Sequence, residues 1–266
     1  MKDWDDAYAN MAHIPGSEAL PAQWAADAAA YRASGISIDE DVAYGDAPRQ
    51  KLDLIWPDAT PKGLAVFVHG GYWMKLCKSD WTHFAEGARA SGWAVAMTGY
   101  TLAPDAQISD MTQETAKAVD LAATRVDGPI RLAGHSAGGH LVSRLACFDL
   151  ALGCADRITQ VLSISGLHDL RPLLRTKMND TLGLTLESAR SESPALLEPR
   201  DAARVTAWVG GGERPEFIRQ ARLLENIWSG FDVEISAFVD GTHDHFSVID
   251  GLKDPHSAIT QAFVGD

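Results

Sequence analysis

One serine of this 266-residue chain stands in a setting suited to nucleophilic chemistry. The stretch RLAGHSAGGHL, Arg131–Leu141, surrounds Ser136 with small residues and matches the pattern Gly-x-Ser-x-Gly. The apolar run Ile130–Ala133 predicts a buried strand before it, and helical periodicity follows it. Gly134 and Gly138 would allow a tight turn that presents the hydroxyl at a helix N-terminus, where peptide N–H groups favour negative charge. This context predicts a nucleophilic serine; the alternative is a turn that only lets strand and helix pack closely.

A serine hydroxyl needs a base to activate it, and the base needs an acid to orient it. In folds built around such a turn, the chain order is serine, then acid, then histidine. The first carboxylate after the seventh predicted strand is Glu213, within GGGERPEF, and we predict that it is the acid. The eighth strand is followed by DGTHDHFSV, which offers His243 and His245. We favour His245 as the base because the apolar segment FSVID directly after it can clamp the ring.

Other residues compete for these roles. Asp169, just after the sixth predicted strand, and Glu216, inside the helix that follows Glu213, are alternative acids. His243 is interpreted as a loop residue. A metal site at the sequence HDH lacks a third ligand at a telling spacing, so no metal is expected.

The negative oxygen that forms during acyl transfer needs two backbone donors. One is expected from the N–H of Ala137, directly after the serine. The second is expected from VFVHGGYWM, where Gly70 and Gly71 let the backbone turn inward. His69 in the same loop is interpreted as a ring that holds the loop, not as the base.

Two bulky rings, Tyr72 and Trp73, directly follow these glycines. We expect them to contact the substrate and to crowd its acyl side, which would favour a small acyl group. The competing interpretation is that both rings only pack against the sheet.

These residues need a scaffold, and the chain supplies alternating strand and helix patterns. The eight predicted strands are Ile38–Tyr44, Gln50–Trp56, Leu64–Val68, Trp93–Thr98, Ile130–Ala133, Thr159–Ile164, Val205–Val209 and Val233–Val239. The predicted helices are Ser79–Ser91, Met111–Arg125, Ala137–Phe148, Pro215–Trp228 and Pro255–Phe263. This alternation predicts an α/β fold with a mostly parallel sheet and helices on both faces; one of the first two strands is expected to be antiparallel. The polar gap at about 167–203 predicts a small cap inserted into a single domain that spans 1–266.

Charge and composition narrow the class of partner. The formal net charge of −13 argues against nucleic acid and against an anionic membrane surface. No apolar run is long enough to span a membrane, and the acidic N-terminus does not resemble a signal peptide. The three cysteines have no metal-ligand spacing and are interpreted as reduced thiols, so a cytoplasmic location is expected.

Together these motifs resemble the α/β-hydrolase fold in its His-Gly-Gly esterase/lipase group, and within that group the kynurenine formamidase (arylformamidase) family. The resemblance is carried by HGGYW at His69–Trp73, GHSAGGHL at Gly134–Leu141, GGERPEFIRQ at Gly211–Gln220 and DHFSV at Asp244–Val248. Weaker similarities lie at Tyr44–Leu54, Tyr100–Pro104 and Ser165–Leu173. One difference is that many family members have aspartate where this chain has Glu213.

The resemblance implies a serine hydrolase with Ser136 as nucleophile, Glu213 as acid and His245 as base. It implies N-formyl-L-kynurenine as the small-molecule substrate, with kynurenine and formate as products, and it implies a homodimer. The same residues would serve a carboxylesterase or thioesterase for short acyl groups, because fold and triad do not fix the leaving group. No cofactor is implied. A non-catalytic binding protein on the same fold is disfavoured, because the serine, the histidine and the His-Gly-Gly loop are all present.

Overall fold

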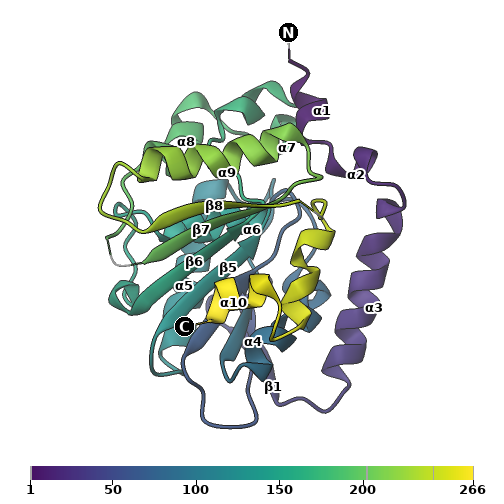
Figure 1. Ribbon diagram of the computed structural model, residues 1–266, viewed down its shortest axis with the longest axis vertical. Coiled ribbons are helices and arrows are strands. Elements are labelled where there is room, and N and C mark those ends of the chain that lie inside the picture. Colours follow the sequence, from purple (N-terminus) through teal and green to yellow (C-terminus); the bar gives the residue numbers. More distant parts are fainter. Residues whose placement is uncertain (1, 202, 242, 266) are drawn as a thin grey trace.

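The computed structural model describes residues 2–201, 203–241 and 243–265. Its centre is an eight-stranded sheet with the strand order β1-β2-β4-β3-β5-β6-β7-β8 (Figure 1). β2 runs antiparallel to β1 and to β4, and the other neighbouring strands are parallel. The predicted eight-stranded, mostly parallel sheet is therefore confirmed. The strands are β1 (Ile38–Ala43), β2 (Lys51–Ile55), β3 (Leu64–Val68), β4 (Ala94–Thr98), β5 (Ile130–His135), β6 (Ile158–Ile164), β7 (Arg204–Gly210) and β8 (Ile235–Asp240).

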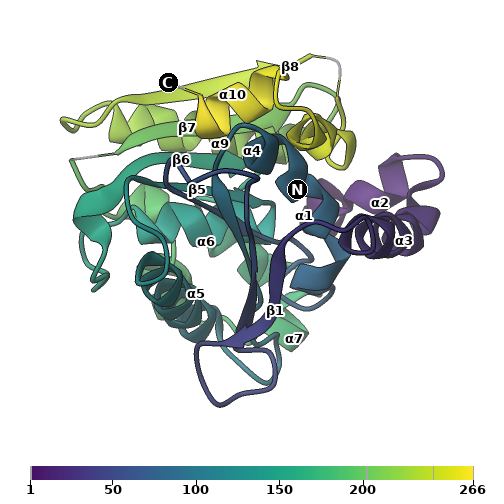
Figure 2. The same cartoon turned by 90° about the horizontal axis from the view of Figure 1, so that it is seen from below.

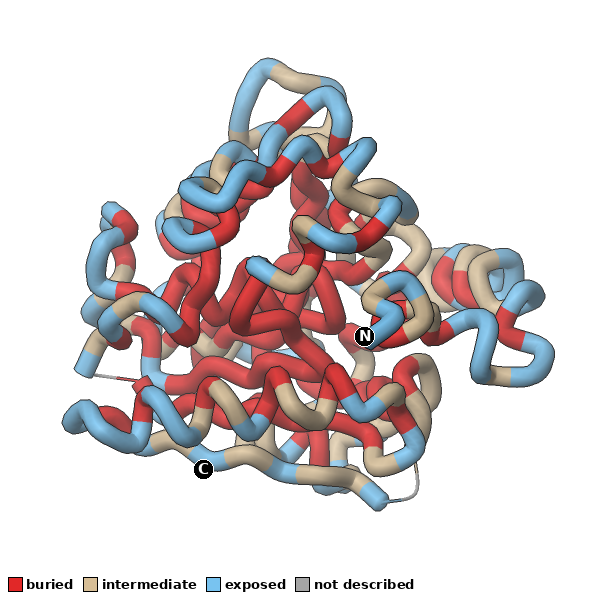
Figure 3. The backbone as a smooth tube through the Cα atoms, turned by 90° about the horizontal axis from the view of Figure 1, so that it is seen from above, coloured by how far each residue is buried: buried red, intermediate tan, exposed pale blue. Residues whose placement is uncertain are grey.

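The central strands are buried on both faces. On β3, Leu64, Val66 and Val68 belong to one hydrophobic core, and Ala65 and Phe67 belong to the other. Successive side chains of a strand point to opposite faces, so a strand covered on both sides is a continuous apolar run. Figure 3 shows these buried segments at the centre of the molecule, with exposed residues on the outer helices and loops.

Helices cover both faces, as expected. The first core includes residues of α5 (Ile108–Ala123), α6 (Ala137–Leu145) and α9 (Pro215–Trp228). The second core includes residues of α3 (Leu20–Arg32), α4 (Glu86–Ala90) and α10 (Ala258–Val264).

The helix predicted over Ser79–Ser91 is broken. It consists of the 3₁₀ turns η2 (Lys78–Asp80) and η3 (Thr82–Ala85) followed by α4. Between the two turns Trp81 has φ −118° and ψ 3°, and its buried indole stacks on Trp24 with the ring centroids 5.0 Å apart. The two turns thus flank a residue whose backbone leaves the helical region while its ring enters the second core.

The N-terminal helices were not predicted from the sequence. They are α1 (Trp4–Tyr8), α2 (Asn10–His13), the 3₁₀ turn η1 (Ser17–Ala19) and α3, and Figure 2 shows α2 and α3 along one side of the sheet. α3 reads LPAQWAADAAAYR. Alanine has a high helix propensity but little hydrophobic contrast, so the apolar periodicity that reveals other helices is weak here. α3 packs against η2 and η3.

The long segment between β6 and β7 holds four short helical pieces. They are η5 (Arg171–Arg175), α7 (Asn179–Leu182), α8 (Leu186–Ser191) and η6 (Pro194–Leu196). η5 contacts α1, and η6 contacts α9. The predicted insertion at 167–203 includes Ala202, which lies outside the described residues. Among the described residues, no helix is both long and apolar enough to cross a membrane.

Candidate active site

Ser136 lies at the sharp turn between β5 and α6. Its φ of 54° and ψ of −113° are strained for a residue with a side chain. The flanking glycines are required by close backbone approach: a Cβ atom at Gly134 would lie 2.2 Å from the Gly138 carbonyl oxygen, and one at Gly138 would lie 2.0 Å from the Val68 oxygen. α6 begins at Ala137, whose N–H is among the first-turn donors without a helical acceptor. The turn therefore places Ser136, which is buried, at the N-terminus of α6, as expected for a nucleophile of this kind.

Two of the residues expected to assist the serine are in direct contact. The Nδ1 atom of His245 lies 2.6 Å from Oε2 of Glu213, and both side chains are buried. An ionised carboxylate can only accept, so Nδ1 donates the hydrogen and the Nε2 atom of the neutral ring is left without one. Phe217 and Phe246 pack on the imidazole with ring centroids 4.6 and 5.3 Å away. The structure thus brings Glu213 and His245 together with the ring clamped by aromatic neighbours.

Glu213 itself is held by two donors on its other oxygen. The hydroxyl of Ser165 donates to Oε1 at 2.5 Å, and the N–H of Gly210 donates to the same oxygen at 2.8 Å. Ser165 lies directly after β6, is fully buried and has φ 51°, a strained value for serine. Ser165 was not predicted from the sequence; the available signal was a serine directly after a predicted buried strand, next to the strand that precedes Glu213.

His135 packs against His245 and bonds its backbone. Its Nε2 atom lies 2.8 Å from the carbonyl oxygen of His245. A carbonyl only accepts, so Nε2 carries the hydrogen. Burial holds the pKa of His135 well below its usual range, which keeps the ring neutral. His135 thus fixes the backbone of His245 without adding a charge beside it.

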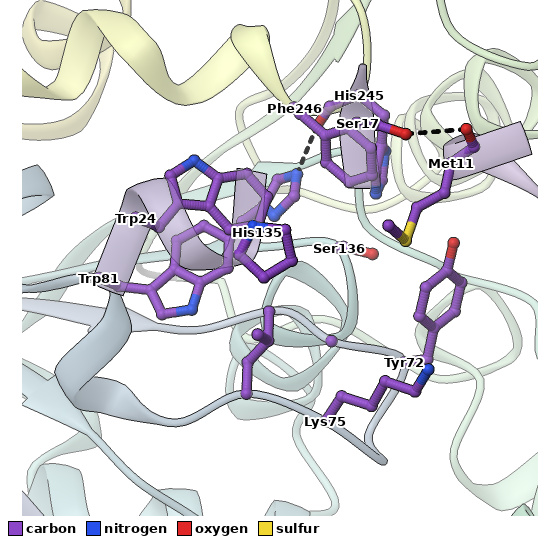
Figure 4. Close-up of a pocket in the computed structure, with 13 residues that line it drawn as sticks. Met11, Ser17, Trp24, Tyr72, Lys75, Trp81, His135, Ser136, His245 and Phe246 are labelled. Carbon is purple, nitrogen blue, oxygen red and sulfur yellow. Dashed lines mark hydrogen bonds between the residues drawn. The ribbon is translucent and has the colours of Figure 1, made fainter. Parts of the chain in front are cut away.

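A cavity of about 70 Å³ lies over Ser136. Figure 4 shows the Ser136 oxygen inside this cavity, below the ring of His245 in that view. Much of the wall is apolar or aromatic, and part of it comes from the N-terminal segment, which the sequence analysis did not connect with the site. No lining residue comes from the described part of 167–203. The lining residues are Met11, Ser17, Pro21, Trp24, Gly71, Tyr72, Lys75, Leu76, Trp81, His135, Ser136, His245 and Phe246.

The glycine loop after β3 packs directly on the serine. A Cβ atom at Gly70 would lie 3.2 Å from the Cβ atom of Ser136. Gly71 has φ 117°, a conformation that favours glycine, and lines the cavity together with Tyr72. The structure therefore brings this loop to Ser136, as the motif predicted.

Trp73 does not lie where the sequence analysis expected it. It is 1% exposed, belongs to the first hydrophobic core and is absent from the cavity lining. Its ring meets His140 edge-on with the centroids 5.3 Å apart. Tyr72 and Trp73 both have a positive φ, 56° and 59°, yet their rings lie in different places. Only Tyr72 remains in the cavity wall.

His69 holds the glycine loop. Its ring stacks on Tyr100 with centroids 4.4 Å apart, and its Nδ1 atom lies 2.7 Å from the Gly70 oxygen. Burial lowers the pKa of His69 to about 4. These contacts agree with the interpretation of His69 as a structural ring.

The alternative acids and the alternative base are engaged elsewhere. Asp169 forms an ion pair with Arg171, and Glu216 forms ion pairs with Lys2 and Arg219. His243 is half-buried, and its Nε2 atom lies 3.8 Å from Oδ2 of Asp240. Within the described residues, no group of three or more His, Cys, Asp or Glu side chains is arranged to hold a metal ion.

A mostly parallel sheet with a strained serine after β5 and a buried acid–histidine pair beside it defines a hydrolase of the α/β class. The chain belongs to the alpha/beta hydrolase fold family, whose sequence model matches residues 65–210. The predicted resemblance to kynurenine formamidases is also confirmed. The chain is 30% identical to the kynurenine formamidase of Salmo salar and 29% identical to that of Danio rerio, in both cases over 83% of this chain and 79% of the relative.

Solved structures agree with this assignment. A candidate thioesterase from Silicibacter sp. tm1040 is 46% identical over 99% of both chains, with a TM-score of 0.93. Esterase B of Lactobacillus rhamnosis shares the fold at 18% identity, with a TM-score of 0.70 over 96% of this chain and 91% of that chain. The chain is thus an enzyme of the hydrolase class.

Proposed function

We propose that this enzyme is a serine hydrolase in which Ser136, His245 and Glu213 form the catalytic triad. The observation that carries the proposal is the relay of contacts from Ser165 through Glu213 to His245, which ends at the cavity that contains the Ser136 hydroxyl. The buried acid orients the ring so that its unprotonated Nε2 can accept the serine proton.

The proposed reaction has two halves. His245 takes the proton of Ser136 while the serine oxygen bonds to the substrate carbonyl carbon, which gives a tetrahedral oxyanion. Backbone N–H groups of Ala137 and of the loop at Gly70 and Gly71 would stabilise this oxygen. His245 then gives its proton to the leaving nitrogen or oxygen, and the acyl group stays on Ser136. A water molecule, deprotonated by His245, attacks this acyl-enzyme and releases the acid.

The substrate that we propose is a small acyl amide of an aromatic amine, with N-formyl-L-kynurenine as the specific compound. The names of the fish relatives support this choice, and so does the small cavity at Ser136. Its walls include Trp24, Trp81 and Phe246, which offer aromatic contact to a ring. An aryl amine also leaves more readily than an alkyl amine, because the ring delocalises the nitrogen lone pair.

A second candidate is a carboxylesterase or thioesterase for short acyl groups. The relative that carries the name of a candidate thioesterase is more similar in sequence, at 46% identity, than the formamidases are. The same triad would perform this reaction, so the leaving group alone separates the two candidates.

The deciding experiment compares kcat/KM across substrates of one purified enzyme. The panel consists of N-formylkynurenine, para-nitrophenyl formate, acetate, butyrate and octanoate, and a short acyl thioester. Turnover of N-formylkynurenine with a preference for formyl over butyryl esters is the expected result. Rates that rise with chain length and no cleavage of the formamide would replace the formamidase by a carboxylesterase.

Three further expectations remain predictions. We propose that residues 1–266 form one domain with an insertion at about 167–203, and limited proteolysis should then cut within the insertion and leave the rest intact. The homodimer implied by the family resemblance is checked by light scattering. The cytoplasmic location is checked by fractionation of the native cells.

A further inference from the structure

Lys75 brings a positive charge to the cavity over Ser136. It is the single lysine, arginine or carboxylate residue among the described residues that line this cavity. Its side chain is exposed, and the ammonium group makes no ion pair or hydrogen bond with any residue that the structure describes. Figure 4 shows it along the lower edge of the cavity in that view, whereas the ring of Tyr72 extends upward toward Met11. An unpaired ammonium group at the edge of an otherwise largely apolar cavity is available to an anionic ligand.

The backbone of Lys75 is fixed relative to the glycine loop. Its N–H donates to the carbonyl oxygen of Gly71 at 2.9 Å, and a Cβ atom at Gly71 would lie 2.2 Å from the Lys75 oxygen. The next residue, Leu76, accepts a hydrogen bond of 2.6 Å from Arg49 at its carbonyl oxygen. The ammonium group therefore extends from a rigid base that is tied to the loop beside the nucleophile.

The cleft on the other side of the aromatic wall carries more negative than positive side chains. This cleft shares Trp24 and Phe246 with the cavity. Its charged lining is Asp27, Asp244, Asp250 and Lys253, and Lys253 is paired with Asp250. The whole chain is also strongly acidic, with a net charge of −13. An anionic group would be repelled from the cleft and attracted to Lys75, so the field across the site orients a charged substrate.

We propose that Lys75 binds a carboxylate on the leaving group of the substrate, so that this hydrolase prefers acidic aryl amides or esters to neutral ones. The proposal deepens the function proposed above and rests on it. Lys75 acts as a specificity residue: it contacts the substrate away from the reacting atoms and moves no proton.

The test compares matched substrates that differ only in charge. One pair is para-formamidobenzoate and para-formamidobenzamide, and the other is para-acetoxybenzoate and para-acetoxybenzamide. Lys75→Met is expected to lower kcat/KM for the carboxylates by about threefold to fivefold and to change it less than about twofold for the neutral amides, since an ion pair at an exposed site is worth at most about that factor. Lys75→Arg should keep most of the preference, and added salt should weaken it in the wild type.

Lys62→Met is the matched control. Lys62 is also exposed and unpaired in the described chain, but it precedes β3, at the end of that strand opposite to Ser136. Lys62→Met removes the same charge and should leave kcat/KM unchanged for both the charged and the neutral substrates. Equal losses on the charged and neutral substrates in Lys75→Met, or the same selective loss in Lys62→Met, would overturn the proposal. If no formamide is cleaved, the proposed substrate fails, but the ester pair still reports on Lys75.

Discussion

The imidazole of His245 and the carboxylate of Glu213 are 2.6 Å apart, although 32 residues separate them in the chain. They meet because β7 and β8 are parallel neighbours, with Gly210 opposite Asp240, so the loops that follow both strands leave the same edge of the sheet. Ser136 reaches that edge from β5. The proposed triad is thus assembled by the common direction of three strands.

Replacement of the proposed nucleophile gives the first prediction. Ser136→Ala should lower kcat by about 10⁴–10⁶ because the acyl-enzyme can no longer form. Mass spectrometry after treatment with a fluorophosphonate should find the label on Ser136 in the wild type. Covalent labelling of the alanine variant at another residue of the cavity would show that this other residue is the nucleophile.

The second prediction separates the two histidines that lie close together in the sequence. His245→Ala should be about as damaging to kcat as loss of the serine, because the two residues act as a unit. His243→Ala should lower kcat at least about tenfold less than His245→Ala does, since the proposed mechanism assigns no proton transfer to His243. Glu213→Gln should cost orders of magnitude, though less than His245→Ala. An active His245→Ala enzyme beside an inactive His243→Ala enzyme would reverse the assignment.

The third prediction concerns the residue that holds the acid. Ser165→Ala removes one of the two donors to Glu213 Oε1 and should lower kcat about tenfold with little change in KM, because the ring of His245 becomes less well oriented. Ser163→Ala is the control. Ser163 is also buried, but it bonds Gly139 and His168 instead of Glu213. A similar loss of kcat in both variants, with lower thermal stability in both, would reduce Ser165 to a packing role.

The fourth prediction tests the wall on the acyl side. Tyr72→Ala should raise kcat/KM for para-nitrophenyl butyrate relative to formate by about tenfold, because each badly fitting methylene costs about 1–3 kcal/mol. Trp73→Phe changes a neighbouring ring that lies in the core and should leave this ratio unchanged. An unchanged ratio in Tyr72→Ala would mean that the acyl group does not meet the tyrosine.

The fifth prediction is acid sensitivity of the fold. Burial lowers the pKa of His140 to about 3 and that of His168 to about 4, against 6.5 in the unfolded chain. Below pH 6.5 the unfolded chain therefore binds protons that the folded protein excludes, so the free energy of unfolding should fall as the pH falls from 6.5 toward these values. The expected slope is about 1.4 kcal/mol per pH unit for each such histidine.

Urea unfolding between pH 7.5 and pH 5 measures this slope. His140→Gln removes one of the buried rings and should lower the slope of unfolding free energy against pH by the contribution of one histidine, about 1.4 kcal/mol per pH unit. The same decline in the variant and the wild type would show that His140 does not contribute.

The local patterns predicted much of the scaffold. The turn around Ser136 was recognisable because its glycines are demanded by contacts within a few residues and with the adjacent strand. The β3 run Leu64–Val68 was predicted with the observed bounds, since a strand buried on both faces is apolar throughout. The contact between Glu213 and His245 could be predicted because the positions of both residues follow from strand order, which is a property of the fold class.

The walls of the cavity could not be predicted in this way. Trp24 reaches the site from an alanine-rich helix far away in the sequence, and no local pattern connects that helix with Ser136. Trp73 turns into the core, where it meets His140, while Tyr72 remains in the cavity, because each ring packs against elements that are distant in the sequence. The roles proposed for Ser165 and Lys75 depend on neighbours on other elements. The residues of a short motif can be recognised from neighbouring positions in the sequence. The shape and charge of the cavity around them depend on packing between residues that are far apart in the sequence.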